Sequence, residues 1–104
     1  MSKRNQPPTN RTGKTHKIKC GNITIYVTIN KDAKGRIVEL FGKSDEGYQG
    51  WVNMLMLTAS LALQHGCPLE TIVRHWRHQR FEPSAFGCSS LPDAIAAKLE
   101  EVAA

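Results

Sequence analysis

Long apolar runs are missing from this sequence of 104 residues. A membrane-spanning helix needs about 20 consecutive apolar residues, and no segment reaches that length. The first eight residues, MSKRNQPP, also lack the apolar centre of a signal peptide. We therefore expect a soluble, cytoplasmic protein that contains no membrane segment. The length is that of one domain with its own core.

Cysteine is scarce, because the chain has only Cys20, Cys67 and Cys88, which are far apart and form no C-x-x-C pair. This spacing favours free thiols in a reducing compartment over a disulfide framework. With His75 and His78, the cysteines supply ligand types that zinc accepts, but structural zinc sites are built from closely spaced ligand pairs. We therefore predict no metal site.

Motifs for catalysis and cofactor binding are missing as well. The sequence has neither G-x-G-x-x-G nor a P-loop, and no glycine-rich nucleophile turn surrounds Ser89 and Ser90. We therefore expect no bound cofactor and no catalytic activity from this chain on its own.

Acidic residues are absent before Asp32, whereas seven of the fourteen Lys and Arg residues precede it. The net charge of +5 therefore comes from the N-terminal part of the chain. Residues 1–15 are polar and lack apolar periodicity, which predicts a disordered basic arm followed by one domain over residues 16–104. Such an arm is either a solvated leader or a binder of phosphate backbones. Its basic residues are Lys3, Arg4, Arg11 and Lys14.

Apolar and polar residues alternate from His16 onward with the period of a β-strand. Two turns divide this region into three strands, and the third, Arg36–Gly42, places Val38 and Leu40 on one face. The pattern predicts a three-stranded antiparallel meander with one apolar face, which needs a cover. The predicted turns are Gly21-Asn22 and Asp32–Gly35.

Three helical segments follow the strands and can supply this cover, so we predict an α+β fold with the helices packed on one face of the sheet. The first helix is apolar almost all the way round, and Met54, Leu57 and Leu61 exceed what one small core can bury. A surplus apolar patch predicts a homodimer or a contact with a partner protein. The predicted helices are Tyr48–His65, Pro68–Gln79 and Ser90–Val102.

Basic side chains gather at the end of the second predicted helix. They have two interpretations, which the sequence leaves open. Guanidinium groups beside imidazoles can bind phosphate, so Arg74, Arg77, His78 and Arg80 are candidate ligands of a nucleotide-like anion. Cations at a helix C-terminus also stabilise the helix dipole by about 0.3–1 kcal/mol each.

The segment Ser89-Ser90-Leu91-Pro92-Asp93 has the S-x-x-D form of a capping box, with Ser90 as the cap and Asp93 reaching back to it. This pentapeptide resembles the signature of the TSCPD domain, with Pro92 and Asp93 matching and Leu91 at the cysteine position. The QHGCPLETIVRH and YVTIN segments and the Arg80-Phe81-Glu82-Pro83 motif are also similar to that family. The resemblance covers roughly residues 17–99.

The resemblance implies a free-standing copy of a small module that is found mainly on adenosylcobalamin-dependent ribonucleotide reductases, as would suit a phage or a bacterium with a split reductase. It therefore implies a role in nucleotide metabolism, through a partner enzyme or a nucleotide-like ligand. The residues alone leave two alternatives open. One is a nucleic-acid-binding accessory protein that uses the basic arm with Arg74, Arg77 and Arg80. The other sequesters nucleotides between protomers.

Overall fold

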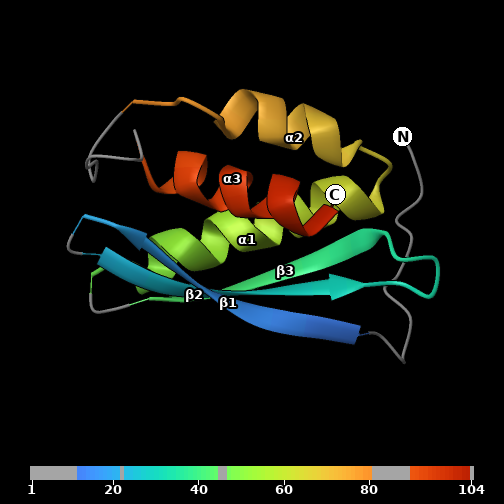
Figure 1. Cartoon of the computed structure of the whole chain (residues 1–104), viewed down its shortest axis with the longest axis horizontal. Helices are drawn as coiled ribbons and strands as arrows, with labels where there is room; N and C mark the ends of the chain where they lie inside the picture. Colours follow the sequence, from blue (N-terminus) through green and yellow to red (C-terminus); the bar gives the residue numbers. More distant parts are fainter. Residues whose placement is uncertain (1–11, 22, 45–46, 81–89, 104) are drawn as a thin grey trace.

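The computed structural model describes residues 12–21, 23–44, 47–80 and 90–103. Three strands precede three helices, and all three helices lie on the same side of the sheet, which confirms the predicted α+β arrangement (Figure 1). The elements are β1 (Thr12–Cys20), β2 (Ile23–Lys31), β3 (Ile37–Ser44), α1 (Gln49–Gln64), α2 (Leu69–Trp76) and α3 (Leu91–Ala103).

The sheet has the order β1-β2-β3 and is antiparallel throughout. Its first strand begins at Thr12, four residues before the predicted start at His16. Pairing of Thr12 with Lys31 extends the backbone ladder past the last apolar side chain. Such pairing needs no apolar periodicity, because main-chain groups make the bonds. The Thr15 and Thr28 hydroxyls also hydrogen-bond across the two strands at 2.7 Å.

The predicted hairpin at Asp32–Gly35 is present and is organised by the Asp32 carboxylate. Its Oδ1 accepts the backbone N–H groups of Lys34 and Arg36, each at 2.9 Å, and its Oδ2 accepts Arg36 Nε at 2.9 Å. These donors, led by the Arg36 backbone N–H, hold the pKa of Asp32 below its ordinary value of 3.8. Gly35 closes the turn with a φ of 79°, a conformation that glycine adopts without strain.

The third strand contains an irregularity that reverses part of the predicted pattern. Lys31 pairs with Ile37 and Asn30 pairs with Glu39, so Val38 is an extra residue in β3. A bulge of this kind shifts the side-chain alternation by one position. As a result Ile37 and Leu40 are buried while Val38 is half-buried. The prediction that Val38 and Leu40 share the apolar face is therefore wrong.

Helix α1 packs along β3 and satisfies backbone groups that face away from β2. The Ser60 hydroxyl accepts the Leu40 N–H at 2.9 Å and donates to the Leu40 carbonyl at 3.1 Å. Gln64 Nε2 donates to the Val38 carbonyl at 3.1 Å. Unpaired groups on an edge strand would otherwise be costly when buried and prone to aggregation when exposed. Polar residues on the buried side of α1 therefore secure this edge.

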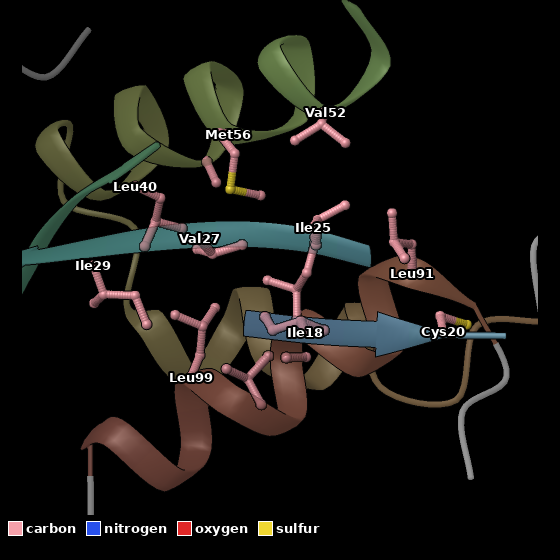
Figure 2. Packing of buried hydrophobic residues seen from close by; sticks show 14 of the residues in the cluster. Ile18, Cys20, Ile25, Val27, Ile29, Leu40, Val52, Met56, Leu91 and Leu99 are labelled. Atoms are coloured by element: carbon pink, nitrogen blue, oxygen red, sulfur yellow. The ribbon is translucent and has the colours of Figure 1, made fainter. Parts of the chain in front are cut away.

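The core lies between the sheet and the helices. Figure 2 shows Ile25 and Val27 of β2 between Met56 and Val52 of α1 on one side and Leu99 of α3 on the other. These side chains are at most 2% exposed. Close packing of this kind leaves little room for added volume.

The state of the cysteines differs in part from the expectation of free thiols. Cys20 is disulfide-bonded and lies in the core, whereas Cys67 carries a free thiol. The expectation of free thiols is therefore wrong for Cys20. Cys88 lies outside the described residues. A long separation in sequence is a weak argument against a disulfide, because the entropic cost of closing a loop grows slowly with its length. None of the helices in the described part of the chain has the length and apolarity of a membrane span.

Candidate functional site

The basic cluster, which comprises Arg74, His75, Arg77, His78 and Arg80, lies at the C-terminal end of α2 and in the turn that follows it. Ile72 and Val73 form the buried side of this helix, and α2 packs against α3 (Figure 1). Because Arg74 lies outside that buried side, its guanidinium is exposed, as are the side chains of His78 and Arg80.

The helix ends at Trp76, three residues before the predicted end at Gln79. A turn replaces its last residues: Arg77 has φ −63° and ψ 134°, His78 has φ 64°, and the Gln79 N–H donates to the Trp76 carbonyl at 3.4 Å. This is the geometry of a type II β-turn, whose third position favours glycine. A histidine held there carries backbone strain of about 1 kcal/mol or more.

Asp93 of α3 holds this turn in place. Its Oδ1 accepts the backbone N–H of His78 at 2.7 Å and Arg77 Nη1 at 3.1 Å. The Asp93 side chain is only 6% exposed, so these partners compensate a buried charge. We call the Arg77–Asp93 pair with its His78 contact the α2–α3 clamp.

Ser90 caps α3 as predicted, because the Asp93 N–H donates to Ser90 Oγ at 3.3 Å. Both residues are buried, as is Pro92 in the first turn of the helix. The capping-box pattern predicts one role for Asp93, in which its carboxylate accepts the Ser90 N–H. That return bond stays a prediction, whereas the contact with the α2 turn is a role that the cap pattern does not reveal.

Arg77 has a second carboxylate partner in Glu100, whose Oε1 lies 3.1 Å from Arg77 Nε. Two acidic groups therefore neutralise this arginine, and its donors are directed toward α3. The sequence reading missed Glu100, although Asp93 and Glu100 are seven residues apart and so share one face of α3. Of the four predicted anion ligands, Arg77 fixes the turn, while Arg74, His78 and Arg80 present their side chains to solvent.

The remaining predicted residues are distributed as follows. Phe81, Glu82 and Pro83 lie outside the described residues, as do Lys3, Arg4 and Arg11 of the predicted arm. Lys14 is part of β1, where it lines a hollow of about 360 Å³ beside Lys31 and the end of α3. Lys31 Nζ donates to the Val102 carbonyl there at 3.2 Å, a contact that stabilises the helix C-terminus.

A larger hollow of about 730 Å³ lies between the hairpin at Gly35 and the start of α2, with Cys67 and Glu70 in its lining. None of its described lining residues belongs to the basic cluster. Within the described part of the chain, no group of three or more His, Cys, Asp or Glu side chains could hold a metal ion. Arg74, His78 and Arg80 of the basic cluster are thus exposed, and the turn beside them is hydrogen-bonded to Asp93.

Comparison with known proteins gives a family match over nearly the whole chain. The family model of the TSCPD domain matches residues 2–103. A vitamin B12-dependent ribonucleotide reductase of Agrobacterium fabrum is 32% identical over 84 residues, which are 78% of this chain and 7% of the reductase. The enzyme of the same name from Bradyrhizobium diazoefficiens is 31% identical over 81% of this chain and 7% of its own length. The one from Streptantibioticus cattleyicolor is 31% identical over 86% of this chain and 15% of its own length.

The chain therefore spans a small part of the reductases that it matches. No solved structure matches it at a significant level.

Proposed function

Because this chain belongs to the TSCPD domain family, we propose that it is a binding module of ribonucleotide reduction, which associates with a reductase or with another enzyme of nucleotide metabolism. The observation that carries this proposal is the alignment with B12-dependent ribonucleotide reductases, which covers 78% of this chain but only 7% of the Agrobacterium enzyme. The matched region is thus a module-sized part of a much larger protein. In this proposal the chain contributes recognition, and the partner contributes the chemistry.

The proposed ligand contact is the exposed part of the basic cluster. Arg74, His78 and Arg80 offer two guanidinium groups and an imidazole, which suit the oxygens of a phosphate group. The α2–α3 clamp supports this role because it fixes the backbone of His78 relative to α3. A turn held in this way loses little conformational entropy when a ligand binds. We therefore propose a nucleotide-like anion as the ligand at this surface.

The surface of α1 supports a further association of the kind that the sequence predicts. Met54 and Leu57 are 62% and 51% exposed, and Trp51 is 39% exposed. Leu61, the third residue of the predicted surplus, is half-buried. Exposed apolar side chains gathered on one helix are typical of protein contacts. We propose that this face pairs two copies of the chain or meets the reductase.

Direct binding to a reductase tests the partner proposal. The purified full chain would be titrated onto an immobilised B12-dependent ribonucleotide reductase from which the region matching this chain has been removed. Saturable binding is the expected result, and added free chain should compete for it. Absence of binding at tens of micromolar would contradict association with a reductase. The intact reductase is the matched control, because its own module should occupy the contact.

A further inference from the structure

The face of the sheet that points away from the helices carries a row of aromatic and basic side chains. Along β2 the burial alternates, so Ile25 and Val27 face the core while Tyr26 is exposed. The register places Tyr26 directly between Lys17 of β1 and Lys43 of β3. Directly paired residues share one face of a sheet. Tyr26 is therefore flanked by an ammonium group on each side.

Phe41 is the second aromatic residue of this face. It pairs with Thr28, which follows Tyr26 at the next position on the same face, so the two rings occupy diagonal positions on neighbouring strands. Diagonal neighbours are roughly 7–8 Å apart at Cα, which is within reach of large side chains. Tyr26 is 46% and Phe41 52% exposed. Phe41 also lines the hollow between β3 and α1, so it marks the border of this face.

The described residues of this face carry more positive than negative charge. Lys17, Lys19 and Lys43 are exposed, and Lys19 continues the row because it pairs with Thr24. Among the described residues of this face Glu39 is acidic, and it lies at the other end, where its Oε1 accepts Asn30 Nδ2 at 3.0 Å. Three ammonium groups around two exposed rings are complementary to a nucleic-acid strand, which combines anionic phosphates with flat bases.

We propose that the face formed by Lys17, Lys19, Tyr26, Phe41 and Lys43 binds single-stranded nucleic acid, with a base stacked on each ring and phosphates near the lysines. Threonine or valine would satisfy the strand preference at positions 26 and 41 equally well, so strand propensity alone does not call for the exposed rings. Stacking tolerates every base, because each has a π-face, and the face therefore selects single strands without selecting sequence. Duplexes keep their bases stacked internally and offer the rings no partner.

This inference goes beyond the proposed function. None of its residues belongs to the basic cluster, and the helices cover the opposite side of the sheet (Figure 1). Failure of nucleotide binding at Arg74 and Arg80 would leave this proposal standing, and the reverse also holds.

Fluorescence anisotropy of the full chain with labelled oligothymidine, oligouridine and a duplex, each of about a dozen nucleotides, tests the proposal, since single-strand sites span about 4–16 nucleotides. Both single strands should bind at low salt, and the duplex should bind more weakly. The ratio of oligouridine to oligothymidine affinity reports any contact with the 2′-hydroxyl. Each phosphate contact contributes about −0.7 to the slope of log affinity against log salt, so three lysines predict a slope of about −2.

Substitutions locate the binding on this face. Tyr26→Leu and Phe41→Leu should each weaken single-strand binding about 5- to 100-fold, because the base loses its stacking partner. Tyr26→Phe keeps a ring and should bind within about twofold of the unmodified chain. Lys34→Gln is the control, since it changes an exposed basic residue of the Asp32–Gly35 hairpin, which is not one of the five residues of this face.

Three results would overturn the proposal. They are the absence of any anisotropy change at low salt, equal affinity for duplex and single strand, and unchanged affinity in both leucine variants. Sedimentation decides whether another copy of the chain covers the face instead. A loss of self-association in Tyr26→Leu would show that it does.

Discussion

Arg77 and Asp93 are joined by an ion pair of 3.1 Å between Nη1 and Oδ1, across the contact of α2 and α3. The same Asp93 oxygen accepts the His78 N–H at 2.7 Å. The aspartate of the signature segment is therefore a structural tie between two helices. It holds the basic cluster in a defined position while its own carboxylate is buried.

Removal of the Asp93 carboxylate should destabilise the fold. We expect Asp93→Ala to lower the free energy of unfolding by about 2–4 kcal/mol, because it leaves the His78 N–H without its acceptor and Arg77 without the buried one of its two carboxylate partners. Asp93→Asn keeps an oxygen acceptor and should cost about half as much. Urea denaturation monitored by circular dichroism measures both values. Glu100→Gln is the control, since its side chain is 53% exposed and an exposed pair contributes about 1 kcal/mol or less. Equal losses of stability for Asp93→Ala and Glu100→Gln would contradict a stabilising role of the α2–α3 clamp.

The turn at His78 should tolerate glycine better than a branched residue. His78 has a φ of 64°, so we expect His78→Gly to change the free energy of unfolding by less than about 1 kcal/mol. A β-branched residue is strained there, and His78→Val should cost about 1–3 kcal/mol. Chemical denaturation of the two variants measures the difference. If valine were as stable as glycine, the left-handed conformation of this residue would be wrong.

Gly42 allows α1 to lie close to β3. A Cβ atom added there would overlap Val52 Cγ1 and lie 3.0 Å from Met56 Cγ. We therefore expect Gly42→Ala to lower the free energy of unfolding by about 1–3 kcal/mol through overpacking. Gly50 of α1 has open space around its Cβ position, and Gly50→Ala should be neutral or stabilise the fold by up to about 1 kcal/mol. Thermal melts of both variants measure the changes in Tm. A decrease of similar size in both variants would contradict the prediction.

The exposed face of α1 should carry the self-association. We expect Leu57→Glu to convert a dimer to a monomer, because the charge of the glutamate would be buried in the contact. The fold should be kept, because Leu57 is 51% exposed in the single chain. Sedimentation velocity at tens of micromolar measures the association state, and circular dichroism checks the fold. Thr58→Glu, at the next exposed position, should have a smaller effect. Sedimentation of the unmodified chain as a monomer would contradict self-association through α1.

The sequence is sufficient to predict those parts of the fold that depend on local patterns. Alternation predicts the meander, helical periodicity predicts the three helices, and Ser90 is recognisable as a cap. The bulge at Val38 is not predictable in this way, because it depends on how β3 meets β2. The same holds for Ser60, whose hydroxyl matters only because Leu40 lies opposite it.

The candidate site is also predictable only in part. Its cluster of basic residues is visible in the sequence, but the sequence does not show which of them holds the turn and which face solvent. Arg77 is neutralised by carboxylates 16 and 23 residues away in sequence. The N–H of His78, whose backbone is left-handed, donates to Asp93 of α3, and the local sequence does not reveal this contact. Tertiary contacts of this kind override the local helix pattern that favoured a helix as far as Gln79.

A thermal-shift titration with ribonucleoside and deoxyribonucleoside di- and triphosphates tests whether the basic cluster at the end of α2 binds a nucleotide-like anion. A ligand at 100 times its dissociation constant stabilises the folded state by about 2.7 kcal/mol, which corresponds to a rise in Tm of roughly 10 °C or more for a chain of this size. We predict such a rise for at least one of these nucleotides. It should be abolished in the Arg74→Gln, Arg80→Gln double variant and kept in Lys34→Gln. An unchanged Tm across the series at millimolar nucleotide, or an undiminished rise in the double variant, would contradict nucleotide binding by Arg74 and Arg80.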